Sequence, residues 1–162
     1  MSAFAGLDLA TPRGRIVAVA RTLHGIPYVW GGNMLSDGGL DCSGFVQYVY
    51  ATAGIEPWAS QYPARLDLTA AGLFGRLAEI PAGAHLLPGD CAFYGRAPGA
   101  VGVAWRIVHV VLVTATSPSG RAIEVAGASR GNRTLTSPDR AIMVVARVRT
   151  FPSPSYRDDF ID

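Results

Sequence analysis

The order of apolar and polar positions predicts helices in the first half of the chain. Apolar residues recur at helical spacing over residues 12–24, and the preceding Thr11 is typical of a helix N-cap. A second helical pattern runs from Cys42 to Gly54, where the glycine acts as a C-terminal stop. Residues 60–80 carry a third and weaker helical pattern.

The second half of the chain changes to the pattern of β-strands. Turn sequences such as SPSG and SPDR accompany four runs that are rich in β-branched residues: CAFYG, IVHVVLVTAT, AIEVAG and AIMVVARVRT. Helices followed by strands are typical of the α+β class, in which helices pack on one side of an antiparallel sheet. We expect one domain over residues 1–150 and a loosely packed, proline-containing tail over residues 151–162.

Composition and charge narrow the range of partners. Apolar residues make up 49% of the 162 residues and charged residues 16%, which excludes a disordered chain. The net charge of +2 comes without a run of Lys or Arg, so we expect no nucleic-acid partner. No segment approaches ~18 uninterrupted apolar residues, so we expect no membrane span.

The first residues bear on where the protein acts. The stretch MSAFAGLDLATPRGR has no basic region followed by an apolar one, which predicts the absence of a secretory signal. We therefore expect synthesis in the cytoplasm. Any action outside the cytoplasm then requires release or injection by another component.

The chain has two cysteines, Cys42 and Cys91. Cys42 lies between Asp41 and Ser43 where the second helix begins, a position compatible with buried filler, half of a disulfide, a metal ligand or a nucleophile. Two cysteines without Cys-x-x-Cys spacing argue against a zinc site, and two free thiols are the default in a reducing cytoplasm. A helix N-terminus stabilises a thiolate, which favours the nucleophile.

A nucleophilic cysteine needs a base, normally a histidine that the fold brings close. Of the three histidines, His24 ends the first helix and His85 lies in a loop, so both are expected to be solvated or loop-capping. His109 lies within the apolar run IVHVVLV. It is either a sheet histidine satisfied by a backbone carbonyl or the base that Cys42 requires.

Four motifs support the second alternative when they are taken in order: PYVWGG, DCSGFVQYVY, LLPGD and VHVVLV. Over about residues 12–150 they resemble the NlpC family of papain-like peptidases of the bacterial cell wall. The resemblance implies an α+β, papain-like fold, with N-terminal helices packed on a central antiparallel sheet and the nucleophilic cysteine at a helix N-terminus. It also implies a substrate, the stem peptides of bacterial peptidoglycan, usually cleaved between D-isoglutamate and the diamino acid.

The resemblance assigns roles by position. Cys42 matches the nucleophile, His109 matches the base, and Tyr28 matches the tyrosine whose hydroxyl helps to stabilise the oxyanion. The backbone N–H of Cys42 would be the second oxyanion donor. Asp41 and Ser43 match residues that hold the free amino end of the stem peptide. No metal ion or organic cofactor is needed.

Three residues near these motifs have a structural and a functional interpretation. The carboxylate of Asp41 opposes a neighbouring thiolate, so we expect it to cap the helix, to bind a substrate ammonium group, or both. Trp30, in the Gly-rich loop, either packs as core or groove wall or lines a substrate subsite. Arg130 is a candidate for binding a substrate carboxylate.

The third member of the catalytic set departs from the family pattern. The strand after the base usually supplies a histidine or another polar residue that orients the base, and here Glu124 stands in that stretch. A carboxylate that accepts the Nδ1–H of His109 would fix the tautomer of the ring. Strand alternation puts Glu124 on one face with Ala122 and Ala126, whereas the alternative is a surface position. The other candidates for the orienting group are Ser129, Asn132 and Asp139.

Several contexts fit a wall peptidase that lacks an export signal of its own. They are a phage endolysin, a phage tail component and an injected antibacterial effector, with a phage, secretion-system or immunity-protein partner. Two other functions fit the same residues. A Cys–His pair in this fold can also carry out acyl transfer or deamidation, and a chain with Glu in place of histidine can be a catalytically degenerate binding module.

Overall fold

The computed structural model describes residues 6–56, 58–61, 68–79, 84–96, 106–129, 133–137 and 147–150. The helical elements come first along the chain: α1 (Pro12–Thr22), η1 (Leu35–Asp37), α2 (Cys42–Thr52), α3 (Trp58–Gln61) and α4 (Ala70–Arg76). The strands follow: β1 (Ala78–Glu79), β2 (Cys91–Arg96), β3 (Arg106–Thr116), β4 (Ala122–Ser129), β5 (Arg133–Ser137) and β6 (Arg147–Thr150). Within the described ranges, no helix has the length and apolar character needed to cross a membrane.

The first two predicted helices are confirmed together with the caps that start them. The Thr11 hydroxyl accepts the N–H of Gly14 at 3.0 Å, and the Asp41 carboxylate accepts the N–H of Gly44 at 2.7 Å. Both contacts satisfy N–H groups that have no partner within the helix. Past the end of α2, Gly54 takes a φ of 80°, as expected of a glycine stop.

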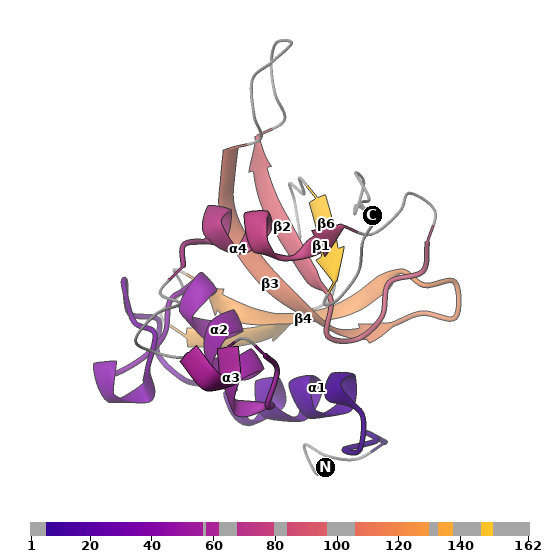
Figure 1. Cartoon of the computed structure of the whole chain (residues 1–162), viewed down its shortest axis with the longest axis horizontal. Coiled ribbons are helices and arrows are strands. Elements are labelled where there is room, and N and C mark those ends of the chain that lie inside the picture. The colour runs from indigo at the N-terminus through magenta and orange to yellow at the C-terminus, as the bar shows by residue number, and fades with distance from the viewer. Residues whose placement is uncertain are drawn as a thin grey trace.

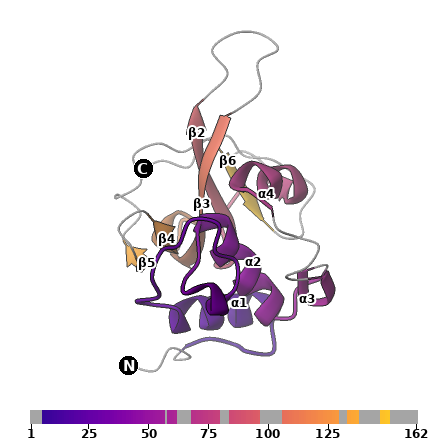
Figure 2. The same cartoon turned by 90° about the vertical axis from the view of Figure 1, so that its left-hand side faces the viewer.

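The strands form one antiparallel sheet in the order β1-β6-β2-β3-β4-β5, with the long strand β3 between β2 and β4. Figure 1 shows α4 in front of β2 and β3, with α1 and α2 beside the lower part of the sheet, and Figure 2 gives the side view. Both α2 and α4 pack on β3. The α+β class is therefore confirmed, with the helices on one side of the sheet.

The prediction was less complete away from the centre of the sheet. The weak helical signal over residues 60–80 corresponds to the short helices α3 and α4, and β1 and β5 had no expected counterpart. Of the predicted run at 141–150, the structure describes β6 alone. The tail at 151–162 lies outside the described residues.

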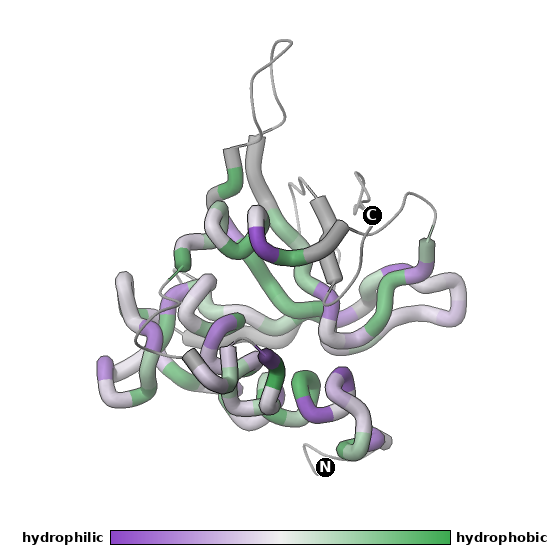
Figure 3. Tube along the Cα trace, in the orientation of Figure 1, coloured by the Kyte–Doolittle hydropathy of each residue, from purple (hydrophilic) through white to green (hydrophobic). Residues whose placement is uncertain are grey.

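The sheet separates two apolar clusters. The larger, on the helix side, includes Phe45, Val49, Tyr50, Phe93, Val110 and Leu112. The smaller includes Leu86, Ala92, Val111, Val113 and Val125. Alternate residues of β3 belong to the two clusters, as the period of a strand requires. Because both faces of β3 are covered, apolar residues dominate its colouring in Figure 3.

Two irregularities interrupt that alternation. Against β2, His109 pairs with Tyr94 but Ile107 pairs with Gly95, so β3 has one extra residue at this point. Against β4, the register shifts on both sides of Ala115. A bulge of this kind lets a side chain depart from the face that strict alternation assigns to it.

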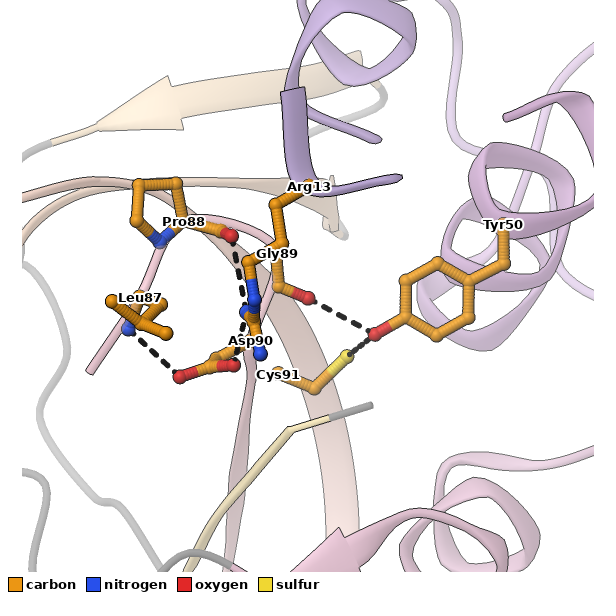
Figure 4. Close-up of polar contacts among 7 residues, drawn as sticks. All are labelled: Arg13, Tyr50, Leu87, Pro88, Gly89, Asp90 and Cys91. Atoms are coloured by element: carbon orange, nitrogen blue, oxygen red, sulfur yellow. Dashed lines mark hydrogen bonds and ion pairs between the residues drawn. The ribbon is translucent and has the colours of Figure 1, made fainter. Parts of the chain in front are cut away.

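A buried polar network holds the start of β2 against the helices (Figure 4). The Asp90 carboxylate is 2% exposed, contacts the Arg13 guanidinium of α1 at 2.6 Å, and accepts the N–H of Leu87 at 2.9 Å. The Tyr50 hydroxyl of α2 donates to the carbonyl of Gly89 at 3.1 Å and lies 3.0 Å from the Cys91 sulfur. The LLPGD motif thus acts as the joint between β2, α1 and α2.

We expect Asp90→Ala to lower the free energy of unfolding by about 3 kcal/mol, because it leaves the Arg13 charge and the Leu87 N–H without their buried acceptor. Urea unfolding followed by far-UV circular dichroism measures the change. The matched control is Asp8→Ala, since Asp8 is exposed and its carboxylate accepts the N–H of Ala10, two residues along the chain. A control as destabilising as Asp90→Ala would contradict the assigned role of the network.

Candidate active site

Cys42 is the first residue of α2 and is half-buried. Both cysteines are free thiols, and Cys91 is fully buried in the sheet. At the first helical position, the Cys42 sulfur lies beside N–H groups that the helix leaves unpaired. The helix therefore provides hydrogen-bond donors to the sulfur and to any oxygen bound next to it.

Asp41 connects this helix to the loop that precedes it. One carboxylate oxygen accepts the Gly44 N–H at 2.7 Å and the Ser43 hydroxyl at 3.2 Å, and the other accepts the Gly31 N–H at 3.1 Å. The backbone N–H of Asp41 also donates to the Gly32 carbonyl at 2.9 Å. The predicted capping role is confirmed, and Ser43, only 6% exposed, belongs to the same network.

The loop packs so tightly that side chains are excluded. A Cβ atom at Gly44 would lie 2.0 Å from the Gly32 carbonyl oxygen, and one at Gly32 would lie 2.2 Å from the Gly39 carbonyl oxygen. These glycines let the loop backbone rest directly on the helix N-terminus. Our reading of the sequence missed this role, although the paired glycines of VWGG and the glycine of DCSG were the available signal.

Tyr28 enters the site through the same loop. It forms an isolated parallel bridge with Leu40, and the Val29 N–H donates to the Leu40 carbonyl at 3.2 Å. Its side chain is half-buried against the helix-side cluster. Trp30, two residues on, is 81% exposed, so it is not a core residue.

The sheet reaches the nucleophile at Val110. The backbone N–H of Val110, the residue after His109, lowers the pKa of the Cys42 thiol, and α2 packs on β3. His109 is half-buried and lies at the bulge, where Ile107 and Val110 both pack on the helix side despite their odd spacing. No sequence motif could have indicated the Val110 contact, because it is made by the backbone.

Burial controls the charges of the site. Desolvation raises the pKa of the Cys42 thiol, outweighing the Val110, Ser43 and Cys42 amides that lower it, and the Asp41 charge raises it further. Desolvation lowers the pKa of His109. At neutral pH the pair is therefore a thiol and a neutral imidazole. The amides of the helix N-terminus lower the pKa of the thiol in the direction that the sequence suggested, but partial burial has the larger effect.

Glu124 does not lie beside His109, contrary to the sequence-based assignment. It pairs with Ala115, six positions along β3 from His109, or about 20 Å at the rise of a strand. Its carboxylate accepts the Thr114 hydroxyl at 2.7 Å and lies 3.8 Å from Arg21 of α1. The pairing of β3 with β4 along their length places it there, and alternation also fails along β4, since Ala122 and Ala126 belong to opposite apolar clusters.

The other assigned residues differ in how far the structure describes them. Ser129 ends β4, and its backbone pairs with Arg133. Arg130, Asn132 and Asp139 lie outside the described residues. Within the described part of the chain, no group of three or more His, Cys, Asp or Glu residues is arranged to hold a metal ion.

Comparisons with known proteins agree with this geometry. Residues 25–117, more than half of the chain, match the model of the NlpC/P60 family. The NlpC/p60 domain of the peptidoglycan hydrolase SagA is 26% identical, with a TM-score of 0.52 over 78% of this chain and 88% of that domain. No curated protein matches the chain.

Two longer proteins share the fold. A Staphylococcus aureus Mu50 protein of the NLP/P60 family, described as similar to a lipoprotein, is 22% identical with a TM-score of 0.59 over 87% of this chain. NlpC2 from Trichomonas vaginalis is 20% identical with a TM-score of 0.62 over 91% of this chain. The present chain spans only 41% and 50% of their respective lengths.

We expect alkylation of Cys42 by iodoacetamide to accelerate by about tenfold per pH unit between about pH 7 and pH 9, because the reactive thiolate is the minor form below a raised thiol pKa. Intact-mass spectrometry measures the rate, and Cys42→Ala reports any background from Cys91, whose pKa burial raises to about 12. A rate that is already constant at neutral pH would indicate a resting thiolate and contradict the assigned charges.

Proposed function

The chain belongs to the NlpC/P60 family, and from this premise we propose that it is a cysteine endopeptidase that hydrolyses amide bonds in the stem peptides of bacterial peptidoglycan. The observation that supports the proposal is that Cys42, the first residue of α2, is influenced by the backbone N–H of Val110, the neighbour of His109, on the strand against which α2 packs. The bond between D-isoglutamate and the diamino acid is the proposed site of cleavage. The proposed catalytic domain spans residues 1–150.

The proposed reaction begins from the neutral pair. His109 takes the thiol proton of Cys42 as the sulfur attacks the carbonyl carbon, so charge develops only along the reaction path. The imidazolium then gives that proton to the leaving amine, and a thioester remains. His109 next removes a proton from water, the hydroxide attacks the thioester, and the returned proton restores the thiol.

Two donors are proposed to stabilise the oxyanion. The Cys42 N–H belongs to the helix N-terminus, whose unpaired amides are fixed in advance of the reaction. The Tyr28 hydroxyl is the second donor, and its support is the attachment of the loop to Leu40, two residues before the nucleophile. Preorganised donors of this kind contribute roughly 3 kcal/mol each in other hydrolases.

The substrate-binding residues follow from the same loop and helix. Asp41 and Ser43 are proposed to receive the free amino group of the stem peptide, since an Asp41 oxygen that accepts one N–H retains capacity for an ammonium group. Trp30, 81% exposed on a loop tied to the helix, is proposed to line a subsite. Arg130 remains a predicted partner for a substrate carboxylate.

The third catalytic position is proposed to be residue 129 instead of 124. The pairing of Leu112 with Ala126 fixes the direction of β4 along β3. If this antiparallel pairing is extended by three residues from Leu112 and Ala126, position 129 falls opposite position 109. Ser129 is therefore the proposed residue for orienting His109.

The proposal is tested by digestion of purified peptidoglycan followed by mass spectrometry of the released fragments. We expect wild-type protein to release stem fragments with new amino termini and Cys42→Ala to lose at least about a thousandfold in rate, because the acyl-enzyme cannot form. Circular dichroism confirms that the variant is folded.

The fragments also decide between this function and the alternatives. Deamidated or acyl-transferred products would indicate the other reactions of a Cys–His pair. Equal activity in wild type and Cys42→Ala would exclude the mechanism, and wall binding without cleavage by folded wild-type protein would indicate a binding module. The proposed phage, secretion-system or immunity-protein partners are separate questions that digestion does not address.

We expect Glu124→Gln to leave the hydrolysis rate within about twofold, because the neighbours of Glu124 are Thr114 and Arg21 and neither of these contacts reaches Cys42 or His109. Ser129→Ala is the contrasting variant and is expected to slow hydrolysis by about tenfold or more. Initial rates on a soluble stem peptide measure both. A tenfold loss in Glu124→Gln with an unchanged Ser129→Ala would return the orienting role to position 124.

A further inference from the structure

Asp41 makes more contacts than a helix cap requires. The N-caps of α1 and α4 are threonines, and each hydroxyl accepts one N–H, from Gly14 and Gly72 respectively. At α2 one Asp41 oxygen does this for Gly44, and the second oxygen reaches out of the helix to the Gly31 N–H at 3.1 Å. The contact with Gly31 joins the helix to the loop that carries Tyr28 and Trp30.

The charge of Asp41 works against the nucleophile, so capping alone does not account for it. The carboxylate raises the pKa of the Cys42 thiol, which disfavours the anion that attacks the substrate. A neutral hydroxyl would cap the helix about as well without this effect, as the ends of α1 and α4 illustrate. What a hydroxyl lacks is a second acceptor oxygen to bind Gly31 at the same time.

We propose that Asp41 is a positioning residue that fixes the Tyr28–Gly32 loop relative to Cys42, so that the oxyanion donors on the loop and on the helix hold one geometry. The role rests on the proposed peptidase function and is additional to the binding of a substrate ammonium group. A displacement of about 1 Å between such groups lowers rates by about a hundredfold in enzymes. The close contacts of Gly32 with Gly39 and Gly44 limit how far the loop moves once the Gly31 contact is lost.

The variant Asp41→Asn separates the contact with Gly31 from the capping of α2. Asparagine caps helices as well as aspartate does. Its side chain has a single oxygen, so whichever way the amide is turned it accepts from Gly44 or from Gly31 and not from both. Capping favours Gly44, which leaves the amide NH₂ facing the Gly31 N–H, two donors that cannot bond.

Kinetics on two matched substrates distinguish positioning from ammonium binding. One is a stem peptide with a free amino terminus and the other is the same peptide with that terminus acetylated. We expect Asp41→Asn to lower kcat by about 10- to 100-fold on both, with KM changed by less than about threefold on the acetylated one. A loss confined to the free-amine substrate and expressed in KM would mean that Asp41 acts on the substrate alone, which would overturn the proposal.

Asp37→Asn is the matched control. Asp37 accepts the N–H groups of Asn33 and Met34, directly after the Tyr28–Gly32 loop, and in the contacts the structure gives its carboxylate does not reach α2. We expect its kcat to stay within about threefold of wild type. If Asp37→Asn is as slow as Asp41→Asn, the internal order of the loop and not its connection to the helix sets the rate, and the proposal is wrong.

A measurement without substrate tests the Asp41–Gly31 contact even if the protein proves inactive on peptidoglycan. In protein labelled with 5-fluorotryptophan, Trp30→Phe assigns the ¹⁹F resonance of Trp30 among those of the three tryptophans. We expect Asp41→Asn to shift or broaden the Trp30 resonance and to leave that of Trp58 in place, since Trp58 is buried in the core. An unchanged Trp30 resonance would show that Asp41 does not hold the loop.

Discussion

The contact between the start of α2 and the middle of β3 is the constraint on which the site depends. Cys42 and His109 come from different halves of the chain, and the packing of α2 on β3 brings their elements together, with the Val110 N–H lowering the pKa of the Cys42 thiol. Interactions far from the sulfur maintain this docking. The Tyr50 hydroxyl holds the other end of α2 on the carbonyl of Gly89, and the ion pair of half-buried Arg13 with buried Asp90 holds the same turn to α1. Changes in this network therefore alter the alignment of base and nucleophile.

The same docking sets the protonation states of the pair. Covering Cys42 and His109 removes water from both, and each neutral form gains over its charged form. The amides of the helix N-terminus and of Val110 oppose this effect only in part. Those amides are nonetheless in place when the proton moves to the imidazole, so they stabilise the sulfur anion where it forms without reorganising. Burial thus suppresses the resting thiolate while keeping its donors ready.

The sequence predicted the contacts between residues close in the chain better than those between distant ones. Helix starts at Thr11 and Asp41 are local and were correct in position and partner. The proposed nucleophile and base were predicted from motifs because residue type restricts those roles. Glu124 was misplaced because the sequence does not fix which residues of β3 and β4 pair, and the register of the structure puts Glu124 opposite Ala115. The Val110 amide and the glycine contacts had no side chain for a pattern to detect.

A neutral resting pair places more demand on geometry than a preformed ion pair would. A thiolate and an imidazolium attract each other over several ångströms, whereas a thiol gives up its proton only to a base within hydrogen-bond reach. The positioning contacts accordingly concentrate around Cys42: the Asp41 carboxylate with its three hydrogen bonds, and the Gly32 carbonyl against Gly44. Glycine at the crowded positions and a carboxylate at the cap are the residue types that allow all of these contacts at once. The DCSG sequence therefore specifies the surroundings of the nucleophile as well as the nucleophile itself.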